Sequence, residues 1–377
     1  MPRATPIAVY YFAFFGTLGV FWPFLALHLA ALGLTPGEIT LLYALIPAMG
    51  LIAPPLAGLL ADALNARVWL LRALSAGAAL AFAAVVHAGA SRVPLYAAVI
   101  AFALCRAPLS PMADASAVEH VRRHGGSFGR VRLWGSIGYL LAAVAGGALL
   151  DAVGPGGVLG ATMVAVTVAA LAAFGLPAPP PHSEPRAFAA ALGLLRQRSL
   201  WLFLAAVTLA QVAGAAYDSC FTLHLQRLGC GGRFTGIAYA IGVLAEVGVL
   251  MVSGRVLARV GPERCFALAL FTAALRWLLL GVVRAPGLIL LLQPLHGITF
   301  GLCYVAGVVI VRERAPRAAQ TAAQGLFAGA FALGGVVGMP LSGQIFERAG
   351  ALALYGTAAV IAALAGAGAT LYARRKA

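Results

Sequence analysis

The sequence has little charge. Only 10% of its 377 residues are charged, whereas an ordinary soluble domain has about 25%. The apolar fraction is 62%, and a water-soluble globule of this length could not hide so much apolar surface. This composition excludes a soluble fold. It also excludes a disordered chain, which needs the opposite balance.

Lysine is nearly absent, because Lys376 is the only one among 26 basic residues. A phosphate-binding P-loop needs a lysine beside a glycine-rich turn, and Lys376 has no such loop near it. ATP-driven pumping by this chain alone is therefore excluded. The net charge of +15 comes from small basic groups between long apolar runs, so we expect no binding to nucleic acid.

The five cysteines show no CxxC spacing and match no metal-binding pattern. Four of them lie in or beside apolar runs as small hydrophobic residues, and only Cys230, in a loop, is a candidate for a disulfide with Cys220. No nucleophile with a neighbouring base stands out. We therefore expect no enzyme, no cofactor, no metal site and no catalytic residue.

Long apolar runs dominate the sequence, and charges, glycines and prolines divide them into twelve candidate spans. These lie near residues 7–31, 39–61, 68–90, 94–117, 134–152, 156–176, 200–224, 234–254, 264–283, 286–311, 319–345 and 351–373. The first run is too long for a cleaved signal. The sequence predicts an all-α integral membrane protein with twelve transmembrane helices.

A proline-rich, charged stretch divides the spans into two sets of six. We predict an N-terminal half at 1–176, a cytoplasmic linker at 177–199 and a C-terminal half at 200–377. With the N-terminus inside, nineteen basic residues lie on the cytoplasmic side and five on the other. The positive-inside rule then places both termini in the cytoplasm, and two halves of six spans are the parallel-repeat plan of rocking transporters.

The segment from Gly58 to Arg67 resembles the loop signature of the major facilitator superfamily. Gly58, Asp62 and Arg67 keep the signature residues, while Ala63, Asn65 and Ala66 depart from it. The resemblance implies the major facilitator fold. It also implies that Gly58, Asp62 and Arg67 act in the conformational change on the cytoplasmic side.

A second resemblance covers nearly the whole chain. The segments 128–138, 242–246, 275–277 and 295–301 are similar to phenylpropionate-permease-like transporters, which are relatives of lactose-permease-type proton symporters. That resemblance implies a substrate-binding set and a proton-coupling set. The implied residues are Asp114, Arg132 and Tyr139 for substrate, and Glu246, Arg276, His296 and Asp218 for coupling or substrate contact.

The resemblance has two departures. Thr299 stands where the lactose-permease type has an essential glutamate, and Asp218 lacks the lysine that pairs with it there. Thr299 therefore argues against a direct copy of that proton-coupling mechanism.

Spacing alone also indicates a polar face on the fifth span. Arg132, Ser136 and Tyr139 recur at one and two helical turns, and Asp114 on the fourth span is expected to meet Arg132. An arginine beside a carboxylate and a ring suits a hydroxylated or carboxylated ring. The alternative is a structural salt bridge with Tyr139 as ordinary packing.

Glu246 lies far from either end of its span, where a carboxylate can gain a proton on one side of the membrane and lose it on the other. Coupling through Glu246 and Arg276 is one interpretation, and a permanent ion pair that fixes helix packing is the other. His296 is either a hydrogen-bonding partner of substrate or Glu246, or a core histidine. Asp218 is either a gate residue or a proton carrier, and Arg106 has no assigned role.

These features predict a secondary transporter in a bacterial inner membrane. We expect proton-coupled symport of a small organic solute, an aromatic acid or a sugar-like compound, by alternating access. The expected partners are the solute, protons and the lipid bilayer, and we expect a monomer. The alternatives are a facilitator or exchanger without protons and a membrane receptor that does not transport.

Overall fold

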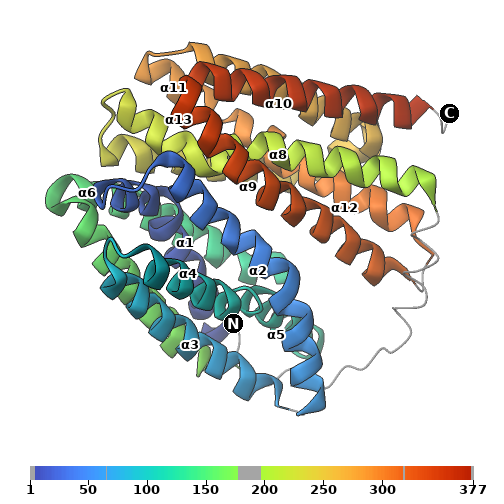
Figure 1. Ribbon diagram of the computed structural model, residues 1–377. Coiled ribbons are helices and arrows are strands. Elements are labelled where there is room, and N and C mark those ends of the chain that lie inside the picture. Colours follow the sequence, from blue (N-terminus) through green and yellow to red (C-terminus); the bar gives the residue numbers. More distant parts are fainter. Residues whose placement is uncertain (1–4, 65, 177–196, 317–318, 375–377) are drawn as a thin grey trace. The chain divides into compact units, whose positions relative to one another are not determined.

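The computed structural model describes residues 5–64, 66–176, 197–316 and 319–374, and every regular element in these ranges is a helix (Figure 1). Most of the predicted linker at 177–199 lies outside the described residues, which resume at 197.

Six helices make up the first half of the sequence where the structure describes it. They are α1 (Thr5–Ala31), α2 (Pro36–Ala63), α3 (Arg67–Ala88), α4 (Arg92–Arg106), α5 (Leu109–His124) and α6 (Phe128–Ala173). The described part of the second half contains seven helical elements. They are α8 (Arg198–Arg227), α9 (Gly232–Val260), α10 (Pro262–Val282), α11 (Pro286–Leu292), the π-helix η2 (Gly297–Leu302), α12 (Cys303–Arg314) and α13 (Gln320–Arg374).

The number of spans agrees with the sequence prediction. Ten helical stretches of the described chain are long and apolar enough to cross a membrane. Two of them, α6 and α13, are each interrupted by a glycine in a left-handed conformation, Gly154 at φ 73° and Gly350 at φ 77°. Glycine adopts this conformation without a steric penalty. Division at these two points gives twelve spans, and the predicted all-α membrane fold is confirmed.

The fourth and tenth spans are broken where one continuous helix was expected. The fourth span stops at Arg106 and resumes as α5 at Leu109, with Pro108 between the two parts. The tenth span stops at Leu292 and passes Pro294 before it continues as η2. Proline removes a backbone donor and clashes with the preceding turn, which explains both breaks. Broken spans at corresponding positions of two halves are typical of transporter binding sites.

The chain forms two compact units that do not coincide with the sequence halves. Unit 1 consists of Met1–Thr35, Leu45–Ser183 and Leu225–Ala240. Unit 2 consists of Pro36–Ala44, Glu184–His224 and Ile241–Ala377. Unit 1 therefore includes the beginning of α9, and unit 2 includes the beginning of α2. The remainder of each of these helices belongs to the other unit.

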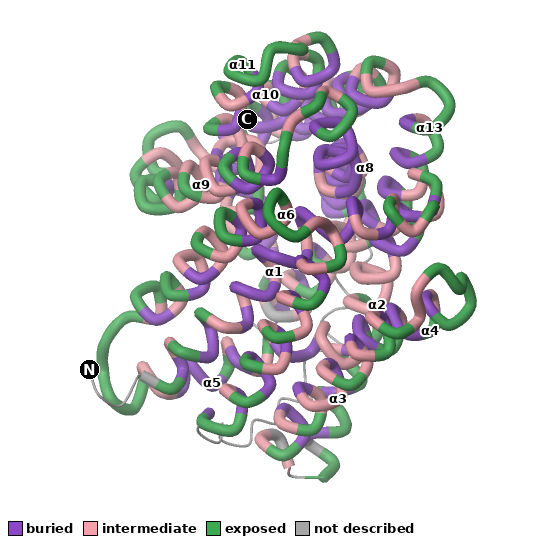
Figure 2. The backbone as a smooth tube through the Cα atoms, turned by 90° about the vertical axis from the view of Figure 1, so that its left-hand side faces the viewer, coloured by how far each residue is buried: buried purple, intermediate pink, exposed green. Residues whose placement is uncertain are grey.

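Large apolar side chains are exposed along many helices. Leu80, Met251 and Leu291 are 74%, 80% and 72% exposed, and Figure 2 shows mainly exposed and intermediate positions along α9. In water such positions would be costly. A bilayer accommodates them, because helices satisfy their own backbone hydrogen bonds and present apolar side chains to lipid.

Candidate functional site

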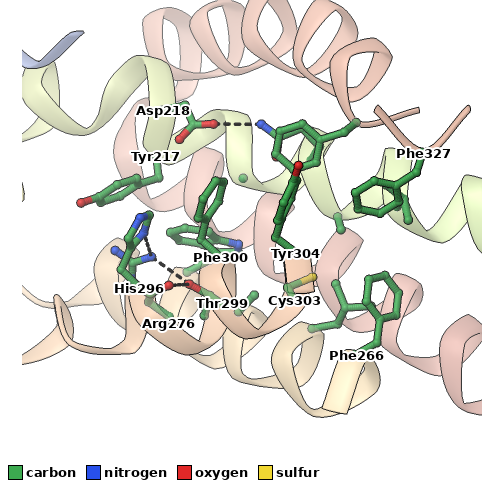
Figure 3. A pocket seen from close by; sticks show the side chains of 18 residues that line it. Tyr217, Asp218, Phe266, Arg276, His296, Thr299, Phe300, Cys303, Tyr304 and Phe327 are labelled. Carbon is green, nitrogen blue, oxygen red and sulfur yellow. Dashed lines mark hydrogen bonds between the residues drawn. The ribbon is translucent and has the colours of Figure 1, made fainter. Parts of the chain in front are cut away.

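Arg276 on α10 is completely buried in unit 2 and is the centre of a polar cluster (Figure 3). Its Nη1 atom donates to Thr299 Oγ1 at 3.1 Å and lies 3.2 Å from His296 Nδ1, and its Nη2 atom donates to Gln293 Oε1 at 3.2 Å. The guanidinium group also lies over the ring of Tyr217, 4.4 Å from its centre. Neutral acceptors and a π face therefore stabilise this cation inside the span.

The three acceptors of Arg276 all come from the broken tenth span. In a regular α-helix, Gln293 and Thr299 would point about 120° apart, because six residues cover 600° of rotation. The break at Pro294 and the π-helix that follows bring both residues to the same guanidinium group. Short π-helical segments occur frequently at functional sites.

His296 lies between Arg276 and Glu246. Its Nδ1 atom faces Arg276, and its Nε2 atom lies 3.9 Å from Oε2 of Glu246 on α9. Coupling through Glu246 and Arg276, and a permanent ion pair between them, were the two interpretations of the sequence. Among the described residues, the hydrogen bonds of Arg276 go to neutral side chains. The histidine ring therefore links the two charged residues.

Two glycines bring η2 close to α9 at this point. A Cβ atom at Gly297 would lie 2.6 Å from the carbonyl oxygen of Ala245, and one at Gly301 would lie 3.1 Å from Cγ of Glu246. Real Cβ atoms essentially never approach backbone as closely as the first distance. Because these two residues have no side chain, η2 can approach α9 closely enough for Glu246 to lie beside His296.

A cavity of about 50 Å³ opens beside this cluster, within unit 2. Its polar wall contains Arg276, His296 and Thr299, together with Asp218, whose Oδ2 atom accepts a hydrogen bond from Gln211 at 2.9 Å. Its other wall is aromatic. That wall is formed by Phe266, Phe300, Tyr304 and Phe327 (Figure 3), and Phe331 also lines the cavity. The arrangement suits a ring with a polar or anionic group at one end.

The predicted substrate residues of the N-terminal half lie in unit 1, but their pairing differs from expectation. Asp114 on α5 accepts a hydrogen bond from the Tyr11 hydroxyl at 2.5 Å. The guanidinium group of Arg132 on α6 stacks over Phe15, 3.7 Å from the ring centre, and lies 5.5 Å from the ring of Tyr11. The described residues give no Asp114–Arg132 ion pair, and Tyr11 instead contacts both side chains, through its hydroxyl and its ring.

The other predicted positions lie on α2, α3 and α6. Ser136 and Tyr139 follow Arg132 on α6 and are half-buried. Gly58 lies in α2, Asp62 lies in its last turn and Arg67 begins α3. The structure does not describe the side chains of Asp62 and Arg67.

Sequence reasoning missed the aromatic partners of both arginines. Tyr217 and Trp277 flank Arg276, and Tyr11 and Phe15 flank Arg132. Tyr217 also donates to Gln293 at 2.9 Å. The only signal in the sequence is that Trp277 directly follows Arg276.

Comparison with known proteins identifies the family. The MFS_1 like family model matches residues 5–357. The chain is 30% identical over 316 residues to the "Probable 3-phenylpropionic acid transporter" of Escherichia coli (strain K12), covering 82% of each chain. It is also 30% identical over 330 residues to the "Maltose permease" of Geobacillus stearothermophilus, covering 86% of this chain and 83% of that one.

Solved structures support the fold. A crystal structure of a mutant of the nucleoside transporter NupG superimposes with a TM-score of 0.87 at 16% identity, covering 98% of this chain and 99% of the other. At this identity the likeness shows the fold alone. The predicted resemblance to permeases is confirmed: the chain is a multi-pass membrane transporter of small solutes, not an enzyme, and belongs to the MFS_1 like family of the major facilitator superfamily.

Proposed function

We propose that this transporter is a proton-coupled symporter of a small organic solute, an aromatic acid or a sugar-like compound. The observation that carries the proposal is the row formed by Glu246, His296 and Arg276, of which His296 and Arg276 line the polar wall of an aromatic cavity. The transporter acts as a monomer in a bacterial inner membrane with both termini in the cytoplasm. The two bacterial relatives and the asymmetry of basic residues support this placement.

In this mechanism Glu246 carries the proton. Ionised Glu246 attracts the proton-bearing side of the His296 ring, and this orients the lone pair of Nδ1 toward Arg276. Protonation of Glu246 removes that attraction and frees the ring to turn. When the ring turns, Arg276 loses His296 Nδ1 as a hydrogen-bond acceptor, and the solute provides another acceptor in its place. Moving an unbalanced charge across the bilayer is costly. Ionised Glu246 balances Arg276 in the empty transporter, and an anionic solute balances Arg276 once Glu246 is protonated, so an anionic solute passes most favourably together with a proton.

The aromatic wall supports the solute class. A ring stacked among Phe300, Tyr304 and Phe331 would place a carboxylate or hydroxyl near Arg276 and Thr299. In unit 1, Asp114, Arg132, Ser136 and Tyr139 are proposed to take part in solute binding, with Tyr11 orienting Asp114. Asp218 is proposed as a polar residue of the cavity wall that assists coupling. Gly58, Asp62 and Arg67 are proposed to act in the conformational change.

The experiment is solute-evoked current and uptake by purified protein in liposomes. The solutes are 3-phenylpropionic acid, maltose and a nucleoside. They represent an aromatic acid, a sugar and the solute class of the transporter with the similar solved structure. Uptake of one class that follows an imposed pH gradient, and loses that dependence in Glu246→Gln, supports the proposal. Binding of a solute with no flux would contradict it and indicate a receptor.

A facilitator or exchanger without protons is the second candidate, and Thr299 favours it. Thr299 is neutral and already accepts a hydrogen bond from Arg276 at 3.1 Å, so one group that could carry a proton beside the arginine is missing. Flux that is insensitive both to an uncoupler and to Glu246→Gln would establish this candidate.

A further inference from the structure

A second and smaller cavity of about 20 Å³ lies wholly within unit 1, and none of the roles proposed above uses it. Helices α1, α3, α4, α5 and α6 all contribute to its wall. Its polar lining consists of Tyr10, Thr17, Ser75 and Arg106. Arg106 is the last residue of α4, at the break in the fourth span.

Two hydrogen-bond donors of this cavity have no partner. Tyr10 is 1% exposed, and its buried hydroxyl lies beside Ser75 but makes no hydrogen bond of good geometry. The Nη2 atom of Arg106 is likewise buried and unpaired, and the described residues give this arginine no ion pair. Its guanidinium group lies 4.6 Å from the centre of the Phe14 ring. This contact and the carbonyl end of α4 favour a cation, but neither supplies an acceptor for Nη2.

The hydroxyl protons of the other two residues are already engaged. Ser75 donates to the carbonyl oxygen of Leu71 at 2.8 Å, and Thr17 donates to that of Phe14 at 2.6 Å. The free donors are therefore a guanidinium N–H and a phenol O–H. A volume of 20 Å³ holds one particle of about the size of a water molecule, which needs about 10–15 Å³. No organic solute fits.

We propose that this cavity binds a single halide ion, held by Arg106 and Tyr10. A water molecule would satisfy the two donors but would leave the arginine charge uncompensated within a membrane span, where an isolated charge is costly. A monatomic anion satisfies both donors and the charge. Chloride is the ion of this class that cells supply in quantity.

The test uses the purified full-length transporter in detergent. Its thermal unfolding midpoint is measured in sodium chloride, sodium bromide and sodium gluconate at equal ionic strength. We expect the midpoint to be higher in either halide by about 3 °C or more at saturating salt. Bromide diffused into crystals should give an anomalous scattering peak in this cavity.

Paired variants localise the effect. Tyr10→Phe removes one donor without changing the shape of the cavity and should weaken the apparent halide affinity about tenfold. Tyr355→Phe is the matched control, because Tyr355 is also a buried phenol without a partner but lies in unit 2. It should leave the halide response unchanged. Arg106→Gln should abolish the response and unfold in gluconate no earlier than the unsubstituted protein.

Equal midpoints in the three salts would show that the cavity holds only water and would overturn the proposal. Equal halide responses of Tyr10→Phe and Tyr355→Phe, or a bromide peak elsewhere, would overturn it as well. If Arg106→Gln does not fold, the tyrosine pair and the bromide peak still decide the question.

Discussion

The Nε2 atom of His296 lies 3.9 Å from a carboxylate oxygen of Glu246. The opposite nitrogen of the same ring lies 3.2 Å from Arg276. A histidine with a carboxylate on one side and an arginine on the other can transmit the protonation of the first to the hydrogen bonds of the second. The proposed function depends on this arrangement.

Glu246→Gln is expected to separate binding from coupling. Glutamine keeps the size of the side chain but cannot carry a proton, so accumulation driven by a pH gradient should fall by about tenfold or more, while solute exchange should persist. The measurement is uptake and counterflow in proteoliposomes. Glu263→Gln is the matched control. Glu263 lies in unit 2 at the beginning of α10 and pairs with Arg314 at 3.6 Å. Solute accumulation by Glu263→Gln should therefore stay within about twofold of that by the unsubstituted transporter.

Arg276→Lys should weaken transport although the charge is kept. Lysine cannot reproduce the planar fork that reaches His296, Thr299 and Gln293 together, nor the stacking on Tyr217. We expect about tenfold weaker solute binding or more, measured by isothermal titration on folded protein. Unchanged affinity in Arg276→Lys would show that this arginine only packs the helices.

Gly297→Ala tests whether the close approach of η2 and α9 matters. The added methyl group would lie 2.6 Å from the carbonyl oxygen of Ala245 and should push His296 away from Glu246, at a cost of about 1–3 kcal/mol. Coupled uptake should fall and thermal stability should decrease. Gly287→Ala is the control, since nothing lies within 4 Å of a Cβ atom there. Equal behaviour of the two variants would contradict the proposed role of the contact.

Asp151 should stabilise the beginning of α9 in unit 1. Its two carboxylate oxygens accept the backbone N–H groups of Gly232 and Arg233 at 2.6 Å and 2.9 Å. Removing such a cap costs about 1 kcal/mol. The thermal midpoint should therefore fall in Asp151→Ala and fall less in Asp151→Asn, which keeps one acceptor. A midpoint in Asp151→Ala equal to that of the unsubstituted protein would refute this role.

The spans and the charged residues within them could be predicted because composition and periodicity report burial in a bilayer directly. Glu246, Arg276 and His296 were singled out because they lie within spans and because the resemblance to permeases implied them. Their connectivity could not be predicted, because helical spacing identifies which face a residue occupies but not which ring from another helix lies between two charges. Two contacts could not be predicted for this reason. His296 lies between Glu246 and Arg276, and Tyr11 donates to Asp114.

The helix breaks were harder to predict than the spans. Pro108 and Pro294 are visible in the sequence, but membrane helices often tolerate proline with only a kink. The π-helix at Gly297–Leu302 depends on contacts with Arg276 and α9 that no local pattern encodes. Likewise, the unpaired state of Arg106 follows from the packing of five helices around it.

The most direct test of the central claim is solute uptake by reconstituted transporter under an imposed pH gradient, with and without Glu246→Gln. The proposed function predicts accumulation of one solute class with the gradient, which an uncoupler abolishes and the substituted transporter lacks. Accumulation or exchange of equal size in both proteins, indifferent to the gradient, would contradict proton coupling through Glu246.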